Sequence, residues 1–208
     1  NSFDLIHAET FYVMPNIPKT SVPVLLVEQT IEFLVYQHFV ETILLPLRMV
    51  LSLDVVKIKF WEEYYWKKAQ KVVAMSAADK IVMKDGVNRL NVDIVPNGVD
   101  TEEFFKVNKE KKKTNTILFV GNFKWLQNKE AVRILVGKVF PKIVKKIPSA
   151  KLWIVGRYPS PQIKNYQSKS IKISDDIDDI KKAYAQSDVL IAPIYGPGGT
   201  RYKILEAM

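Results

Sequence analysis

The stretch TILFVGNFKWLQNKEAVRILVGKVFPKIVKKIPSAKLWIVG, residues 116–156, decides the fold. It opens with an uninterrupted apolar run that suits a strand covered on both faces. Apolar residues then recur at helical spacing, and a second apolar run closes the stretch. Strand, helix and strand in this order predict parallel pairing with a right-handed crossover, the unit of a Rossmann-like α/β domain. The helical positions are Ala131, Leu135, Val139 and Ile143.

The same alternation continues on both sides of this stretch. After it, SIKIS (170–174) and DVLIAPI (188–194) predict strands, and the acid-started segment between them predicts a helix. Before it, we expect a second α/β unit. Its strands are predicted at 3–9, 22–29, 71–76 and 92–97, and its helices at 31–53, 58–70 and 77–84.

The two units are expected to join near VPNGVDTEEFF, residues 95–105, which contains turn-forming proline, asparagine and glycine. The charged run KEKKK, 109–113, is expected to be part of a solvated linker. We therefore predict a first domain over 1–97, a linker over 98–113 and a second domain over 114–208. The sequence starts without methionine and stops inside a predicted helix, so we expect it to be incomplete at both ends.

The composition excludes several classes of site. The chain has no cysteine and two histidines, so disulfides and thiolate metal sites are excluded and we expect no structural metal. The net charge of +9 suits an anionic partner, either a nucleotide, a membrane surface or a nucleic acid. The most apolar segment, 42–53, is interrupted by Pro46 and Arg48 and is too short to span a bilayer, so a packed helix is favoured.

A glycine-rich turn follows the last predicted strand, where loops of a parallel sheet converge on ligands. Gly198 and Gly199 allow close backbone approach, and Thr200 is expected to be the N-cap of the following helix. Exposed amides at a helix start favour an anion, and Arg201 and Lys203 add positive charge. The turn therefore suggests a phosphate site.

Glu206 shares a helical face with Tyr202 and Lys203. A carboxylate accepts hydrogen bonds, and the paired hydroxyls of a ribose donate them, so Glu206 could bind a nucleotide ribose. An ordinary ion pair with Lys203, three residues earlier, explains the same spacing equally well. Both interpretations stay open on the residues alone.

The segment APIYGPGGTRYKILEAM, 192–208, resembles the donor-site motif of family 4 glycosyltransferases, which have the GT-B fold. Three further segments resemble the family in the same order along the chain. They are VVAMSAADKIVM (72–83), IVPNGVDTEEF (94–104) and ILFVGNFKWLQNKEAV (117–132). The resemblance covers nearly all of 72–208 and, more loosely, 3–9 and 22–33.

This resemblance implies a glycosyltransferase that moves a sugar from a nucleotide-sugar donor to an acceptor, in a cleft between two Rossmann-like domains. Residues 1–97 would be the later part of the acceptor-side domain, and 114–208 an incomplete donor-binding domain. The family generally retains anomeric configuration and uses no metal, so no cofactor is expected. The donor would be a UDP- or GDP-sugar, and the acceptor a glycan, a glycolipid or a polysaccharide.

The resemblance also implies site residues. Glu206 would hold the ribose, the 198–200 backbone would face the donor sugar and its phosphates, and loops near Arg157 and 174–177 would approach the base. The family's diphosphate arginine and lysine align with Asn122 and Asn128, so Lys124 and Lys129 would have to replace them. The implied donor-binding residues are Gly121, Asn122, Lys124, Lys129, Arg157, Asp176, Gly198, Gly199, Thr200, Arg201, Lys203 and Glu206.

The first domain departs further from the family. Gln29 stands where a histidine is common, which leaves His7, Glu28 and Gln29 as catalytic candidates. Gly198 stands where many members have an acidic residue. We therefore keep a non-catalytic nucleotide-sugar-binding protein as an alternative. A Rossmann dinucleotide-dependent oxidoreductase is disfavoured because FVGNFKW supplies one glycine where that motif needs three.

The expected partners are the nucleotide-sugar and the glycan or lipid-linked acceptor, and no nucleic acid. The location expected from the resemblance is cytoplasmic, with association at the membrane surface. FWEEYYW, 60–66, is compatible with a membrane-surface acceptor, although aromatic residues at helical spacing also suit a packed core.

Overall fold

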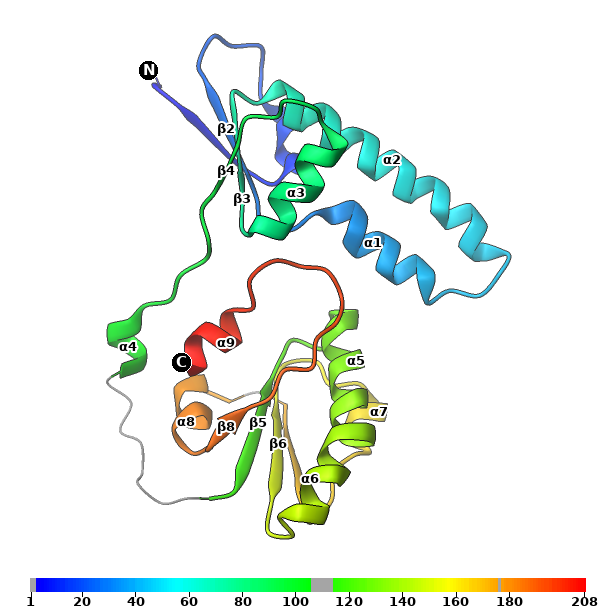
Figure 1. Ribbon diagram of the computed structural model, residues 1–208, viewed down its shortest axis with the longest axis vertical. Helices are drawn as coiled ribbons and strands as arrows, with labels where there is room; N and C mark the ends of the chain where they lie inside the picture. Colours follow the sequence, from blue (N-terminus) through cyan, green and yellow to red (C-terminus); the bar gives the residue numbers. More distant parts are fainter. Residues whose placement is uncertain (1–2, 106–113, 176) are drawn as a thin grey trace. The chain divides into compact units, whose positions relative to one another are not determined.

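Two four-stranded parallel sheets, each flanked by helices, form the framework of the chain (Figure 1). The computed structural model describes residues 3–105, 114–175 and 177–208. The chain divides into two compact units. The first comprises Asn1–Asn97 with Gly196–Arg201, and the second comprises Gly98–Tyr195 with Tyr202–Met208.

The sheet of the first unit has the strand order β1-β2-β3-β4. Leu26 pairs in register with Val72, and both side chains are fully buried, as expected of strands covered on both faces. Trp66 and Met83 pack against these strands from the flanking helices. The elements are β1 (Ile6–Glu9), η1 (Phe11–Asn16), β2 (Val24–Glu28), α1 (Glu32–Glu41), α2 (Leu47–Lys68), β3 (Lys71–Ala74), α3 (Ala77–Gly86) and β4 (Val92–Ile94).

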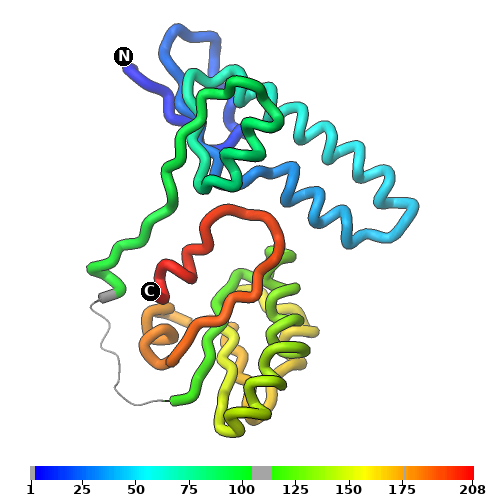
Figure 2. The backbone as a smooth tube through the Cα atoms, in the orientation of Figure 1, coloured from blue at the N-terminus to red at the C-terminus, as the bar shows by residue number. Residues whose placement is uncertain are grey.

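The ends of helices α1 and α2 differ from the predicted ends in two places. One helix was predicted over 31–53, but the structure has two: α1 ends at Glu41 and α2 begins after Pro46. The ring of Pro46 and its missing N–H do not fit inside a helix. The predicted break between 53 and 58 is wrong, because α2 continues through it to Lys68. Figure 2 shows the two helices running side by side as a hairpin, which turns at the end distant from the sheet.

The sheet of the second unit has the order β7-β6-β5-β8, again parallel. Phe119 and Ile154 are partners in the register of β5 and β6, and both are fully buried. The elements are α4 (Thr101–Phe105), β5 (Thr116–Val120), α5 (Leu126–Ile134), η2 (Leu135–Val139), α6 (Phe140–Lys146), β6 (Lys151–Val155), α7 (Pro161–Lys164), β7 (Ile171–Ser174), α8 (Ile180–Ala185), β8 (Val189–Leu190) and α9 (Tyr202–Ala207).

The helical segment that connects β5 to β6, made of α5, η2 and α6, is not a regular α-helix throughout. Its middle turn, η2, is a π-helix, and Pro141 lies in the first turn of α6 directly after it. A proline in a regular α-helix would leave the carbonyl of the residue four before it, Gly137, without its N–H donor. The wider π turn changes the hydrogen-bond register just before the proline and lets the helix continue.

Two further segments differ from the predicted pattern. The strand predicted over 188–194 spans only Val189–Leu190, and Pro193 in the remainder has no N–H to donate to a neighbouring strand. Part of the predicted linker, Thr101–Phe105, forms α4, and Glu103 of this helix makes an ion pair with Lys181 at 2.6 Å. The KEKKK run lies outside the described residues.

Candidate functional site

The carboxyl end of the second sheet is closely packed where β5 and β6 end. The Gly121 N–H donates to the Val155 carbonyl at 2.9 Å, and the Phe123 N–H donates to the Arg157 carbonyl at 3.0 Å. A Cβ on Gly156 would lie 1.6 Å from the Gly121 carbonyl oxygen, so only glycine fits there. The two predicted donor loops are thereby held at one edge of the sheet.

Lys203 reaches this edge from α9. Its Nζ lies 2.8 Å from Asn128 Oδ1 and 4.9 Å from the centre of the Phe119 ring. Asn128 in turn donates its Nδ2 to the Asn122 carbonyl at 2.8 Å. An ammonium group is thus held beside Asn122 and Asn128, the two positions at which the resemblance implies basic side chains.

Glu206 lies one turn further along α9 and contacts α8. Its Oε2 accepts a hydrogen bond from the Tyr184 hydroxyl at 2.6 Å. Burial, and then this hydrogen bond to the carboxylate, raises the pKa of Tyr184, so the phenol stays protonated and donates. Both side chains also line a cavity of about 560 Å³ in the second unit.

The remaining predicted residues of this unit are more exposed. Lys124 lies over the Tyr158 ring with its Nζ 4.0 Å from the ring centre, and its N–H donates to Asn122 Oδ1 at 3.0 Å. Lys129 is exposed in the first turns of α5, and the side chain of Arg157 is exposed in the loop after β6. Asp176 lies outside the described residues.

The glycine turn is stabilised by its own arginine. Arg201 donates Nη1 to the Gly198 carbonyl and Nη2 to the Gly196 carbonyl, the latter at 2.6 Å. Helix α9 begins at Tyr202, so Arg201 and not Thr200 directly precedes it, and the prediction that Thr200 is its N-cap is wrong. The turn groups with the first unit, in which a Cβ on Gly199 would lie 2.7 Å from the Gln29 carbonyl oxygen.

In the first unit, Glu9 connects two of the three catalytic candidates. Its carboxylate lies 3.0 Å from His7 Nε2 and accepts from Gln29 Nε2 at 2.9 Å. The half-exposed His7 is 53% accessible in its side chain, so solvent can reach the imidazole. This group lies at the carboxyl ends of β1 and β2, where parallel sheets bind ligands.

Glu28, the third candidate, is buried and separate from that group. Its Oε1 accepts from the Trp66 indole at 3.0 Å, and burial raises its pKa to about 8. Glu62 is also fully buried and accepts from the N–H groups of Glu32 and Phe33, each at 2.8 Å. Burial raises the pKa of Glu62 to about 7. These two carboxyls connect α2 to β2 and to the start of α1.

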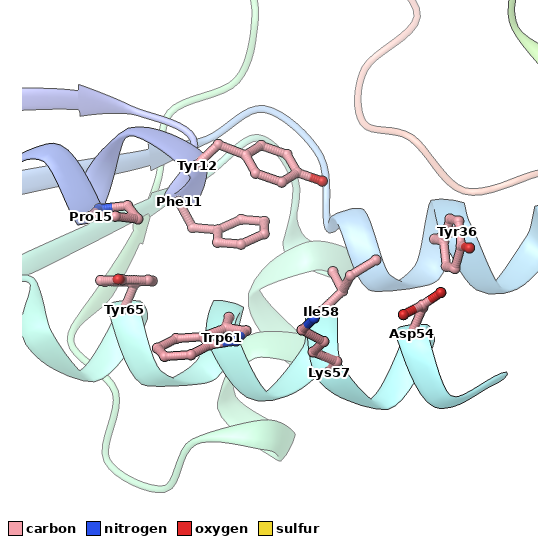
Figure 3. A pocket seen from close by; sticks show the side chains of 9 residues that line it. All are labelled: Phe11, Tyr12, Pro15, Tyr36, Asp54, Lys57, Ile58, Trp61 and Tyr65. Atoms are coloured by element: carbon pink, nitrogen blue, oxygen red, sulfur yellow. The ribbon is translucent and has the colours of Figure 1, made fainter. Parts of the chain in front are cut away.

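A second cavity, of about 610 Å³, lies in the first unit between η1, α1 and α2. Figure 3 shows Phe11 and Tyr12 of η1 above Trp61 and Tyr65 of α2, with Tyr36 and Asp54 toward the hairpin end. Its lining is mainly aromatic, and Asp54 and Lys57 provide the charged groups. The cavity suits a ligand with a largely apolar part.

The residues that the structure describes include neither a metal-ligand cluster nor a helix that could cross a membrane. No group of three or more histidine, cysteine, aspartate or glutamate side chains is arranged to hold a metal ion. Among the helices of the same residues, none is both long and apolar enough to cross a membrane.

Solved structures define the class of the fold. The crystal structure of TarM matches with a TM-score of 0.73 at 12% identity, over 98% of this chain and 38% of TarM. A trehalose-phosphate synthase (UDP-forming) from Burkholderia vietnamiensis matches with a TM-score of 0.59 at 10% identity, over 98% of this chain and 55% of the synthase. These are GT-B glycosyltransferases, and the predicted GT-B-like α/β fold is confirmed.

The second unit resembles a known family in sequence. Residues 114–208 match the family described as "Glycosyl transferases group 1". The predicted resemblance to glycosyltransferases is confirmed over these residues.

Curated relatives are similar at low identity. The phosphatidyl-myo-inositol mannosyltransferase of Mycobacterium tuberculosis (strain ATCC 25618 / H37Rv) is 26% identical over 149 residues, which is 67% of this chain and 39% of the relative. An uncharacterized 44.6 kDa protein in the cps region of Klebsiella pneumoniae is 26% identical over 164 residues, 73% of this chain and 42% of the relative. The chain thus spans about two fifths of the length of these relatives.

The sequence did not predict the contacts of three residues, Tyr184 and Asn128 in the second unit and Glu62 in the first. Tyr184 lacked a signal because its partner, Glu206, is 22 residues away in sequence. Asn128 was identified only as a departure from the family, and its contact with Lys203 spans 75 residues. Glu62 could have been noticed as a carboxylate inside an aromatic segment, since such a group must find donors when buried.

Proposed function

We propose that the protein transfers a sugar from a nucleotide-diphosphate donor to a glycan or glycolipid acceptor, with retention of anomeric configuration and without a metal ion. The match of residues 114–208 to group 1 glycosyltransferases supports this proposal. One fold relative was solved as a complex that includes UDP, and another, trehalose-6-phosphate synthase, was studied for glycosyl transfer with retention. A UDP- or GDP-sugar is the proposed donor.

The hydrogen bond between Tyr184 and Glu206 carries the proposal most directly. A carboxylate offers about four acceptor positions, and the Tyr184 hydroxyl occupies one of them on Oε2. The others suit the paired hydroxyls of a ribose, and the phenol fixes the orientation of the carboxylate before the donor arrives. Preorganised acceptors of this kind reduce the ordering cost of binding.

The donor diphosphate needs positive charge, which Lys203 supplies in the proposed site. Its Nζ, positioned by Asn128, lies beside the Gly121 loop and compensates for asparagine at both family positions of basic residues. Lys124, Lys129 and Arg157 provide further positive charge around the same loops. Stabilising the charge that develops on a leaving diphosphate is chemistry that basic side chains can perform without a metal.

A glycolipid is the acceptor class that the first unit supports best. The aromatic cavity of about 610 Å³ could take the apolar part of such an acceptor, while Asp54 and Lys57 contact its polar part. One curated relative is a phosphatidyl-myo-inositol mannosyltransferase, so an acceptor with a lipid part is precedented. We propose a cytoplasmic protein that acts at the membrane surface, where such an acceptor would be presented.

Calorimetric titration with a panel of UDP- and GDP-sugars tests the donor site. We expect one donor to bind, and Glu206→Ala to weaken it by about 1.5–3 kcal/mol because a charge-assisted hydrogen bond is lost. Glu102→Ala, an exposed change on α4, is the matched control and should bind as the unmodified protein does. If Glu206→Ala bound the donor as tightly as the unmodified protein does, the proposed role of Glu206 in donor binding would be wrong. If the donor bound but no sugar were transferred to any acceptor, the result would favour a nucleotide-sugar sensor.

A further inference from the structure

A third cavity, of about 540 Å³, lies in the second unit at the amino-terminal edge of its sheet. Thr116, Lys151 and Ile171 are the first residues of β5, β6 and β7, and all three line this cavity. The loops of the proposed donor site follow the opposite, carboxyl ends of the same strands. The cavity is therefore separate from the donor site and has no part in the function proposed above.

Three lysines bring positive charge to the cavity. Lys151, Lys169 and Lys172 line it, and none of the lining residues, all of which the structure describes, is acidic. Trp153 pairs with Lys172 in the register and lies two residues after Lys151, so these three side chains share one face of the sheet. Lys172 Nζ lies 4.3 Å from the centre of the Trp153 ring. Lysines gathered in a hollow without a carboxylate among them favour an anionic ligand.

Asp188 is acidic and bonded to the same edge of the sheet, but its carboxylate is occupied. Its Oδ2 accepts from the N–H and the hydroxyl of Thr114, at 3.1 and 3.0 Å, and from the Thr116 N–H at 3.0 Å. Asp188 lines the cavity of about 560 Å³ that contains Glu206, and it is not among the lining residues of this one. Its charge is thus directed to the threonine donors rather than to the lysines.

The loop before β7 adds hydrogen-bond donors to the cavity. Ser168 Oγ accepts from the Ile171 N–H at 3.1 Å, which leaves its hydroxyl proton for another acceptor. Ser170 Oγ lies 3.5 Å from Ser168 Oγ, so both hydroxyls can turn toward oxygens of one phosphate group. The Ser168 N–H donates to the Ile171 carbonyl at 2.9 Å, and the Leu152 N–H donates to the Ser170 carbonyl at 2.8 Å. The loop is therefore fixed before a ligand arrives, which reduces the ordering cost of binding.

We propose that this cavity is a second anion site, which binds a small phosphorylated ligand. The three ammonium groups contact its phosphate oxygens, and the two serine hydroxyls donate to the same oxygens. A phosphorylated ligand suits these five groups better than a carboxylate does, because a carboxylate offers only about four acceptor positions. The site does not depend on sugar transfer and would be present in a protein that transfers no sugar.

NMR titration of the ¹⁵N-labelled protein with sodium pyrophosphate tests the site, because each backbone amide gives its own signal. We expect the signals of Ser168, Ser170 and Ile171 to shift until they saturate, with a dissociation constant below about 1 mM. Lys151→Gln with Lys169→Gln should weaken this binding at least about tenfold, since two charged donors are lost. Both side chains are exposed, so the double variant should keep its fold, which the dispersion of the same signals checks.

The matched control is Lys138→Gln with Lys142→Gln. It removes the same charge from exposed positions on η2 and α6, helices that pack on the sheet face opposite Trp153. This control should bind pyrophosphate as the unmodified protein does, and equal weakening in the two double variants would reduce the effect to overall charge and overturn the site.

Three further results would also overturn the proposal. The first is that the amide signals of residues 168–171 do not shift at millimolar pyrophosphate. The second is that the shifts are confined to the loops after β5 and β6, which would assign pyrophosphate to the donor site. The third is equal affinity for sodium sulfate at the same ionic strength, which would show that the cavity does not select phosphate.

Discussion

The hydroxyl of Tyr184 on α8 lies 2.6 Å from the Oε2 atom of Glu206 on α9. The phenol also lies 3.4 Å from the Lys203 carbonyl, so one side chain contacts both of the predicted donor residues on α9. Phe104 of α4 packs edge-on against the Tyr184 ring at 5.9 Å between centroids. The position of the Glu206 carboxylate therefore depends on a neighbouring helix rather than on α9 by itself.

Tyr184→Phe should weaken nucleotide-sugar binding by about 0.5–1.5 kcal/mol, the usual net value of one hydrogen bond. The ring and its packing remain, so the thermal unfolding midpoint should change little. Calorimetry and thermal unfolding of the same sample check both expectations. Tyr195→Phe, which changes an 83% exposed residue, is the control, and equal donor affinity in the two variants would show that Tyr184 does not position Glu206.

Lys203→Gln should lower donor affinity by about 1.5–3 kcal/mol, since a charged donor to the diphosphate is lost. Asn128→Ala should give a smaller loss of the same kind, because the ammonium group remains but its 2.8 Å contact with Oδ1 is removed. Free nucleotide and nucleoside should be titrated alongside the diphosphate donor. If Lys203→Gln weakened the nucleoside as much as the diphosphate, the proposed role of its charge would be wrong.

The buried carboxyl of Glu28 predicts a stability that falls with rising pH. Its pKa is about 8 in the folded protein against 4.5 ordinarily, so the folded state binds the proton more tightly than the unfolded state does. The contribution of the protonated Glu28 carboxyl to the free energy of unfolding is therefore fully present below about pH 4.5 and is lost as the pH rises through about 8. Glu62, with a pKa raised to about 7, adds a change of the same sign.

Urea unfolding at several pH values between 5 and 8 measures this dependence. Glu28→Gln keeps an acceptor for the Trp66 indole and cannot ionise, so the free energy of unfolding should vary less with pH than in the unmodified protein. Glu102→Gln, an exposed substitution, should leave the original pH dependence in place. Identical pH profiles for the unmodified protein and Glu28→Gln would mean that Glu28 is not protonated in the folded state.

Two glycine substitutions should have opposite effects on stability. Gly156→Ala would place a Cβ 1.6 Å from a backbone oxygen, and we expect it to lower the free energy of unfolding by at least about 2 kcal/mol. Gly137→Ala meets no atom within 4 Å and lies inside a helical segment, so it should stabilise by about 0.5–1 kcal/mol. Chemical unfolding of both variants checks this, and a neutral Gly156→Ala would show that the loops after β5 and β6 can separate at little cost.

The alternation of buried strands and amphipathic helices was sufficient to predict both parallel sheets. The ends of individual helices were predicted less well, because hydrophobic spacing and proline gave conflicting signals. Hydrophobic spacing predicted one helix over 31–53, but Pro46 separates α1 from α2. The predicted break after residue 53 does not occur, and α2 continues to Lys68, with Glu62 and Trp66 buried. Hydrophobic spacing alone did not predict the π turn before Pro141; the proline itself was the signal in the sequence.

The candidate site was predictable in its types of residue and less so in its contacts. The family resemblance implied Lys203 and Glu206 as donor-binding residues, but it did not indicate that Arg201 would donate to carbonyls of its own turn. Side-chain pairs such as Lys203 with Asn128 depend on which strand ends are neighbours in the sheet. That information arises only when the sheet is assembled.

Glu62 and Trp66 are one turn apart on α2, and each is bound to a different neighbour, the first turn of α1 and the end of β2. The helical hairpin is therefore clamped at its base by two hydrogen-bonded groups, while its far end carries apolar side chains into solvent. The base of the hairpin is thereby fixed to the sheet at Glu28, the last residue of β2, which directly precedes the candidate residue Gln29.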